Sequence, residues 1–433
     1  MKPVGKALFL ALLLYSFLHL GYSVLRYNAF SGISSGDFNR VYQEATYWVR
    51  SATYSPDGVW HPPFYYWLLI TLDRWLGGQQ NLIYFFYFLQ FLLFPWAIHL
   101  LVQSVRAPSS RFGFPVLYGA SAILVLNFQP LLETLAQHKV EGIEFFLICL
   151  AIWAFRREKD GLCGAAVVLA TNLKFLPGIL LLYFLVKREW KVLWGAAAGM
   201  GILLMILIFS FSAQTLRSGL IQQPMDQLFS HRLEGTSPNA SVEMQTLTGM
   251  VNRWLAKPKP PTSFMEYITR GSYMPVPQAK LAQALSVGLR LLLLAGWLAL
   301  IRHRWRRTER QARWSLFLLE ISVTLVMILV VSQAARVHYG ILLLPGFVIL
   351  GLLLLQQSSA FHLTEKLLFF VGYGLSAMVV PGGLLNRLPP HPMWGTRYSQ
   401  WYLWWSLPMW GYLLLGLCAV LCWKRAFKRG TAA

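Results

Sequence analysis

Long apolar blocks separated by short polar loops constrain this chain more than any other feature of its sequence. The blocks run for about 15 to 24 residues, and the longer ones could cross about 30 Å of hydrocarbon as helices. Apolar residues make up 56% of the 433 residues and charged residues only 13%, which is too little charge to cover a water-soluble surface. Helices are the natural spanning form in lipid, so the sequence predicts an all-α, polytopic membrane protein.

Much of the formal net charge of +21 lies in short loops between apolar blocks. Such loops are found at 156–159, 187–191, 302–313 and 424–429. The positive-inside rule explains this distribution, so we interpret the charge as topology and expect no nucleic-acid partner. The basic amino terminus precedes an apolar run at 5–25, which we interpret as a retained first helix.

The pattern predicts about twelve membrane segments in a single integral-membrane domain over 1–433. Residues Phe64 to Leu76 are too short and too aromatic to span, and we interpret them as an interfacial helix. A first external loop is expected at 26–81 and a longer one at 213–280. Ten of the segments are full spans, expected near 5–25, 82–103, 114–132, 141–155, 191–212, 281–301, 315–333, from His338-Tyr339 onward, 365–385 and 405–423.

The remaining two segments lie between the basic loops at 156–159 and 187–191, where two full spans do not fit. We predict two short helices, about 161–171 and 175–186, that meet near Lys174. Pro177 suits the start of the second helix. A lysine deep in a bilayer is costly, so Lys174 should face a polar cavity or a partner.

Polar residues that topology does not explain gather in the segments expected at the outer face. Such a pocket, with one candidate carboxylate and several cations, suits sugar transfer from a polyprenyl phosphate. A positioned Asp can take the proton of the acceptor hydroxyl, and cations can stabilise the departing phosphate. No compact metal-ligand motif is seen, and neither a metal nor a cofactor is expected. The residues are Asp37, Glu44, His61, Gln137, His138, Lys139, Glu141, Lys174, Arg253, Arg336 and His338.

Each candidate also has a structural interpretation. Asp37 follows Gly36 in a sound N-cap context. Glu44 follows Arg40 by four residues, and we favour a salt bridge between them over a second acid. Lys174 could bind phosphate or snorkel. The remaining cations could be structural, solvated or interfacial: His338, Arg253 and Arg336.

Six motifs along the chain resemble a known family. They are Asp37-Phe38 with Tyr42; Tyr54; His61-Pro62-Pro63-Phe64; Lys174-Phe175-Leu176-Pro177 with a basic turn at 187–190; Asn239-Ala240-Ser241 with Arg253; and Arg336-Val337-His338-Tyr339. In this order they resemble the polyprenyl-phosphate-mannose-dependent glycosyltransferases of family 87, within the GT-C type. Two departures are His61, where the family usually has Tyr, and Ala136-Gln137-His138-Lys139, where it usually has Gly-Gln.

The resemblance implies a GT-C fold whose external loops carry short interfacial helices. It implies an inverting transfer with Asp37 as the base, His338 lining the active site, and Lys174 and Arg253 near the donor phosphate. The donor would be a polyprenyl-phosphate monosaccharide such as mannose and the acceptor a lipid or glycan, at the external (periplasmic) face of a bacterial cytoplasmic membrane. Further predicted substrate-binding residues are Arg336, His61, Tyr42, Glu44, Gln137 and His138.

Two other functions stay open. A transporter or flippase for a lipid-linked glycan would also present a cationic cavity, although transporters often show repeat symmetry and midplane sites. An oligosaccharide ligase or polymerase would instead use a diphosphate-linked glycan. The unequal external loops and the acid in the first loop argue against the transporter.

Overall fold

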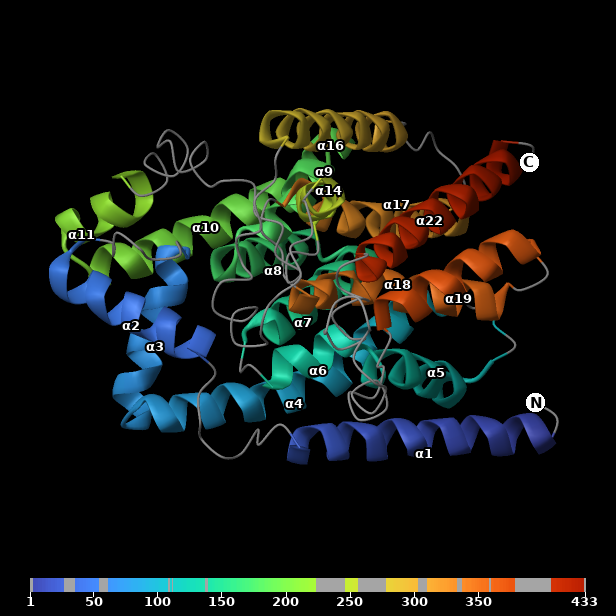
Figure 1. Cartoon of the computed structure of the whole chain (residues 1–433), viewed down its shortest axis with the longest axis horizontal. Coiled ribbons are helices and arrows are strands. Elements are labelled where there is room, and N and C mark those ends of the chain that lie inside the picture. Colours follow the sequence, from blue (N-terminus) through green and yellow to red (C-terminus); the bar gives the residue numbers. More distant parts are fainter. Residues whose placement is uncertain are drawn as a thin grey trace. The chain divides into compact units, whose positions relative to one another are not determined.

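A computed structural model of the chain describes residues 3–26, 36–53, 61–107, 110, 112–136, 139–222, 246–255, 278–302, 310–332, 337–357, 360–377 and 406–431. Every regular element within these ranges is a helix (Figure 1). This confirms the predicted all-α class. Six of the described helices are long and apolar enough to cross a membrane. The total of about twelve spans stays a prediction.

Residue contacts divide the chain into two compact units. The first consists of Met1–Leu126 and Leu131–Leu233, and the second of Asn127–Pro130 and Glu234–Ala433. The first unit contains α1 (Pro3–Arg26), α2 (Gly36–Ser51), α3 (Pro63–Leu76), α4 (Gln79–Val105), α5 (Phe114–Leu126), most of α6 (Gln129–Ala136), α7 (Glu141–Arg156), α8 (Asp160–Leu173), the 3-10 helix η1 (Leu176–Gly178), α9 (Ile179–Lys187), α10 (Trp190–Ser210), α11 (Ala213–Arg217) and the π-helix η2 (Ser218–Gln222). The second contains α14 (Leu247–Leu255), α16 (Ala279–Ile301), α17 (Arg310–Val331), the 3-10 helix η3 (Val337–Leu343), α18 (Leu344–Gln356), α19 (Leu363–Ala377) and α22 (Leu407–Thr431).

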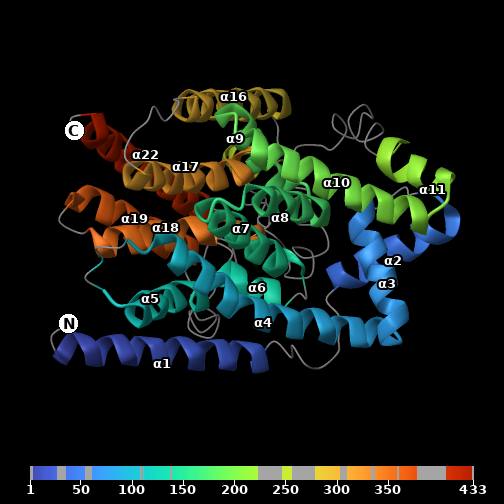
Figure 2. The same cartoon turned by 180° about the vertical axis from the view of Figure 1, so that it is seen from behind.

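Helix α8 packs against α10 along a seam of small residues. A Cβ atom added to Gly195 on α10 would lie 2.5 Å from the Cα atom of Gly161 on α8. A Cβ atom on Gly164 would overlap the backbone of α10 at Val192. Small residues allow such close backbone contact between membrane helices. Helix α7 lies beside both α8 and α4 (Figure 2), so α7, α8 and α10 form a tightly packed core that fixes the end of α8.

Helix α2 is amphipathic and packs through its buried face. Trp48 is fully buried, with ring centroids 5.7 Å from Tyr66 on α3 and 4.9 Å from Phe211 after α10. Its indole N–H donates a hydrogen bond to the Ser218 hydroxyl of η2 at 3.0 Å. Nearer the start of α2, Phe38 contacts Phe86 of α4. These contacts fasten α2 to α3, α4 and η2.

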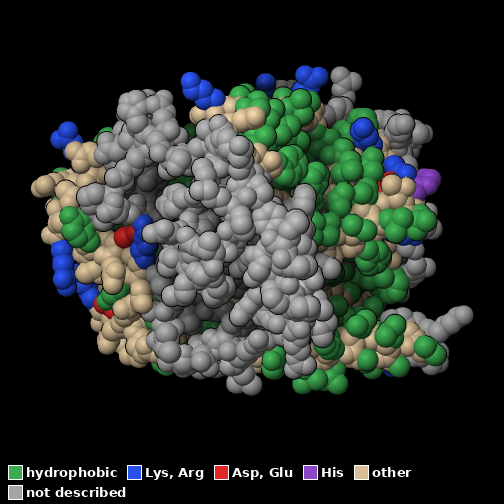
Figure 3. Space-filling model, viewed as in Figure 1, with side chains coloured by type: hydrophobic (Ala, Val, Ile, Leu, Met, Phe, Trp, Pro, Cys, Tyr) green, Lys and Arg blue, Asp and Glu red, His purple; other side chains and the backbone are tan. Residues whose placement is uncertain are grey.

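Large apolar side chains lie exposed on several of the longest helices. Leu8 on α1, Phe209 on α10 and Leu292 on α16 are examples. On the face that Figure 3 shows, hydrophobic side chains cover broad areas of the described surface and few acidic side chains are visible. Exposed apolar surface of this extent is what lipid covers in a membrane protein, in agreement with the multi-pass class.

The predicted broken hairpin is confirmed: α8 ends at Leu173, η1 follows, and α9 ends at Lys187. The helix predicted at 64–76 is also present as α3, although its interfacial location stays a prediction. The predicted continuous span at 114–132 is wrong, because α5 ends at Leu126 and α6 begins at Gln129. Pro130 has no N–H to continue an earlier helix, which accounts for the break.

Candidate functional site

Lys174 lies at the break between α8 and η1. Its backbone is extended, with φ −150° and ψ 145°, and its N–H donates to the Ala170 carbonyl oxygen at 3.1 Å. Pro177 explains why α8 stops at Leu173. In a continuing helix the nitrogen of residue 177 would have to donate to the carbonyl of Leu173, and proline has no N–H. The break therefore leaves Lys174 beyond the end of an apolar helix.

The Lys174 ammonium pairs with a buried carboxylate. Its Nζ atom lies 2.5 Å from Oε1 of Glu141, and the side chains are 11% and 0% exposed. Glu141 is in the first turn of α7, where the partial positive charge of the helix end favours an acid. The prediction that Lys174 faces a polar partner is confirmed.

A second acid lies one turn further along α7. Glu144 is fully buried, and neither of its carboxylate oxygens has a hydrogen-bond partner among the described residues. The charges that act on it are those of Lys174 and Glu141. We call these three residues the Lys174 cluster. Two acids and one cation enclosed in an apolar core are costly, which marks the cluster as a candidate for function.

His61 lies next to the Lys174 cluster. It is buried, and its ring lies edge-on to Tyr65 and Tyr66, with centroids 5.5 and 5.9 Å away. Burial, followed by the charge of Lys174, lowers the pKa of His61 to about 3. The imidazole is therefore neutral near pH 7 and can accept or donate a hydrogen bond without adding charge.

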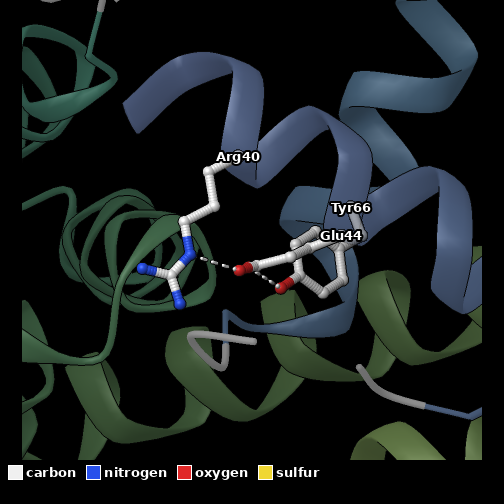
Figure 4. A network of polar contacts seen from close by, with 3 residues as sticks. All are labelled: Arg40, Glu44 and Tyr66. Atoms are coloured by element: carbon white, nitrogen blue, oxygen red, sulfur yellow. Dashed lines mark hydrogen bonds and ion pairs between the residues drawn. The ribbon is translucent and has the colours of Figure 1, made fainter. Parts of the chain in front are cut away.

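Helix α2 contributes a second polar group to this region. The Arg40 Nε atom lies 3.1 Å from Glu44 Oε1, and the hydroxyl of Tyr66 on α3 donates to Glu44 Oε2 at 3.3 Å (Figure 4). The predicted salt bridge between Arg40 and Glu44 is confirmed. Arg40 also acts electrostatically on His61. The charges of Arg40 and of the Lys174 cluster thus both act on His61.

Two partly buried residues of α2 interact with α3 and α4. Asn39 accepts a hydrogen bond from Gln79 of α4. Burial, followed by Asp73 of α3, raises the pKa of Tyr42. Helix α2 begins at Gly36, so Asp37 belongs to its first turn and does not precede it as an N-cap would. The side chain of Asp37 is not among those described.

The other predicted site residues lie elsewhere. Arg253 belongs to α14 and His338 to η3, both in the second unit, and their side chains are outside the described set. Arg336, Gln137 and His138 lie outside the described residues. Of the predicted set, the structure brings Lys174, His61 and Glu44 into one region. The gathering of the remaining residues around them stays a prediction.

Sequence reasoning noted Glu141 without giving it a partner and missed Glu144. The signal was present, because two acids three residues apart at the start of an apolar block share one helix face. Acids are scarce in this chain, with 17 Asp and Glu residues against 38 Lys and Arg. Two of them inside one helix turn are therefore a signal from which Glu144 could have been found.

Within the described ranges, no three His, Cys, Asp or Glu side chains are grouped as metal ligands would be. What the region offers is an ammonium group with little water around it, a neutral imidazole and several carboxyl groups. A cation in such surroundings attracts an anion more strongly than it would in water. The arrangement can therefore bind an anionic group and exchange protons beside it.

Six described helices are long and apolar enough to cross a membrane, which is the mark of a multi-pass membrane protein. Residues 60–332, more than half of the chain, match the family model for glycosyltransferase family 87. The chain belongs to this family and is a membrane glycosyltransferase. The matched range contains the Lys174 cluster, begins after Asp37 and ends before His338. No curated protein matches the chain.

Proposed function

We propose that this protein transfers a monosaccharide from a polyprenyl-phosphate donor to a lipid or glycan acceptor, with Asp37 as the general base. Family membership supports glycosyl transfer. The observation that favours a lipid phosphate donor is Lys174, an ammonium group 11% exposed at a helix break inside an apolar core. A cation held in this way can stabilise negative charge that develops on a leaving phosphate.

In the proposed reaction, the acceptor hydroxyl oxygen forms a bond to the anomeric carbon of the sugar. The bond from that carbon to the phosphate oxygen breaks, and the phosphate leaves with the electron pair. The proton of the hydroxyl passes to the Asp37 carboxylate. A single displacement inverts the anomeric configuration, because the acceptor attacks the face opposite to the phosphate.

The proposal gives the remaining residues supporting roles. Lys174 and Arg253 bind the donor phosphate, and Arg336 adds positive charge near it. His338 lines the active site. Tyr42, Glu44, His61, Gln137 and His138 contact the sugar or the acceptor. Mannose is the first sugar to test, and the proposed location is the external, periplasmic face of the cytoplasmic membrane.

The decisive experiment is Asp37→Asn in purified, bilayer-reconstituted protein supplied with polyprenyl-phosphate mannose and a glycolipid acceptor. We expect turnover to fall by about 10²- to 10⁴-fold, the usual contribution of general base catalysis. Asp160→Asn is the matched control, because Asp160 starts α8 beside the basic loop at 156–159; its turnover should match wild type. Near-wild-type turnover in folded Asp37→Asn would remove Asp37 as the base.

The ligase or polymerase alternative requires a diphosphate-linked donor. Matched donors with one or two phosphates separate the two proposals. The proposed function predicts transfer from the monophosphate donor and little from the diphosphate. Membership of a glycosyltransferase family argues against the transporter alternative.

A further inference from the structure

The Lys174 cluster contains more acid than its one cation balances. Glu141 pairs with the Lys174 ammonium at 2.5 Å. Glu144 lies one helical turn away, fully buried, with both carboxylate oxygens unpartnered among the described residues. If both acids were ionised, the cluster would hold one uncompensated negative charge in an apolar core, which costs several kcal/mol.

Among the described side chains around the cluster, none is as buried a cation as Lys174. On α4, the side chains that lie against Gly142 are the neutral Gln90 and Phe94. His61 is neutral near pH 7 because burial lowers its pKa to about 3. Arg40 is already paired with Glu44. The other nearby cation is Lys139, which precedes α7, is only partly buried and acts on His61. Two interacting carboxyl groups in such a place titrate as a pair and can share a proton.

We propose that Glu141 is the resting counter-ion of Lys174, that Glu141 and Glu144 hold one proton between them, and that donor binding replaces Glu141 with the donor phosphate while the pair takes up a second proton. The inference rests on the proposed function, in which Lys174 binds the donor phosphate. The exchange is balanced in charge. The singly charged phosphodiester and one proton from solvent enter, and the ionised carboxylate on Lys174 becomes a neutral carboxylic acid.

The proton follows from electrostatics. Once the donor phosphate pairs with the Lys174 ammonium, an ionised Glu141 would lie beside the phosphate without a cation of its own. The carboxylate and the phosphate would both be shielded from water. Protonation removes that charge. Because the bound state holds one more proton than the free state, donor affinity is highest at low pH. The dissociation constant then rises by about tenfold per pH unit between the apparent pKa of the pair in the free protein and its higher apparent pKa in the donor-bound protein.

The test is calorimetric titration of the full-length protein in lipid nanodiscs with farnesyl methyl phosphate. This phosphodiester carries one charge that does not titrate between about pH 5 and 9, so the ligand itself releases no proton. Each titration is run at one pH in two buffers of different ionisation enthalpy. The difference between the two heats counts the protons that are taken up. We expect uptake of about one proton per bound ligand in the wild type.

Glu141→Gln/Glu144→Gln removes both proton-accepting groups, and uptake should fall close to zero between about pH 6 and 7.5, where lysine stays charged. A purely structural role would leave the number of protons unchanged. The matched control is Glu158→Gln, at an exposed position beyond the other end of α7, which should bind like wild type and keep the proton uptake. The wild-type measurement needs no variant and stands even if the double variant does not fold.

The outcomes separate the inference from the proposed function. Lys174→Met should bind farnesyl methyl phosphate at least tenfold more weakly than the wild type does. If it does so and the wild type takes up no proton, the proton exchange is overturned and the phosphate site stands. If the wild type does not bind the probe, or Lys174→Met binds equally well, the phosphate site itself fails and the inference fails with it. Full proton uptake by the double variant would overturn the assignment to Glu141 and Glu144.

Discussion

Two ion pairs built on a buried glutamate, one in each unit, use the same kinds of residue in different ways. In both, a fully buried glutamate in the first turn of an apolar helix pairs with a cation from another part of its unit. Glu141 of α7 pairs with Lys174 at 2.5 Å, and Glu365 of α19 pairs with Arg425 of α22 at 2.8 Å. Arg425 lies inside a continuous helix, whereas Lys174 lies at a helix break.

The neighbours of the two pairs differ as well. The Cys418 thiol of α22 donates to the backbone carbonyl of Glu365 at 3.3 Å. Trp423 of α22 donates to the buried Glu320 of α17 at 3.2 Å. These contacts join α22 to α19 and α17. Around Lys174 there are instead a neutral histidine and a buried acid, Glu144, whose carboxylate oxygens have no hydrogen-bond partner among the described residues. The comparison teaches that a buried ion pair can fasten helices or present a charge, and that its neighbours indicate which.

The largest expected effect is on sugar transfer, which should depend on Lys174 but not on Arg425. Lys174→Met should lower turnover by about 10²-fold or more, as removal of a group that stabilises a leaving anion does. Arg425→Met should keep turnover within about twofold, per folded molecule, because the proposed chemistry does not use it. The measurement is sugar transfer by reconstituted protein, normalised to the folded fraction. Equal losses in the two variants would break the comparison.

The next effect concerns stability. Arg425→Met leaves the Glu365 carboxylate buried without this partner. The unfolding free energy should fall, by less than the about 3–5 kcal/mol typical of a fully buried pair, because the Arg425 side chain is 31% exposed. Arg425→Met/Glu365→Leu removes both charges and should regain most of that loss. In the first unit, Lys174→Met/Glu141→Leu should also regain stability but not turnover. Denaturant unfolding in mixed micelles measures the unfolding free energy. If Lys174→Met/Glu141→Leu recovered turnover, the first pair would be structural like the second, and the distinction between the two pairs would be wrong.

His61, next to the first pair, should make the stability of the protein depend on pH. The pKa of His61 is about 3 in the folded protein, against about 6.5 in an unfolded chain. Between these values the unfolded state binds a proton that the folded state does not. Stability should therefore fall as pH drops from about 6.5 toward 3, by at most about 1.4 kcal/mol per pH unit from this residue.

His61→Gln should flatten this part of the profile of unfolding temperature against pH. The matched control is His362→Gln, an exposed histidine just before α19, which should keep the wild-type profile because water surrounds it in both states. An unchanged slope in His61→Gln would show that His61 is not held neutral by its surroundings.

The smallest expected effect uses two tryptophans. Trp48→Phe removes the hydrogen bond to Ser218, and Trp423→Phe removes the one to Glu320. Each should cost about 1 kcal/mol of stability, somewhat more where the acceptor is charged. Only Trp48→Phe should also lower turnover, because Trp48 fixes α2, whose first turn contains Asp37. Ser218→Ala should reproduce that result in paired assays of unfolding and transfer.

Local patterns in the sequence predicted part of this arrangement. The break at Lys174 followed from the spacing of two basic loops and from Pro177, both of which act within a few helical turns. The pair of Arg40 and Glu44 followed from their four-residue separation on a helix. The positions of charges and prolines, and the lengths of the segments between them, were therefore sufficient to predict the broken hairpin and part of the α2 group.

The rest depends on packing between distant segments. Glu141 and Lys174 are 33 residues apart, and they meet only because α7 packs beside α8. His61 is buried against aromatic residues of α3, and this burial, followed by charges from distant segments, lowers its pKa. Sequence reasoning could therefore connect it only with substrate binding. The break before α6 was missed although Pro130 marked it, because the apolar run continues across it.

The shortness of α8 has a consequence for the lipid. Its 14 residues rise about 21 Å as a helix, whereas the hydrocarbon layer is about 30 Å thick. In the proposed orientation α8 starts at the cytoplasmic boundary, so Lys174 ends well below the level of the outer headgroups. A donor phosphate then has to descend toward it, or the bilayer has to thin locally around the protein. Sugar transfer would therefore slow in bilayers of longer acyl chains, which raise the headgroups further above the ammonium.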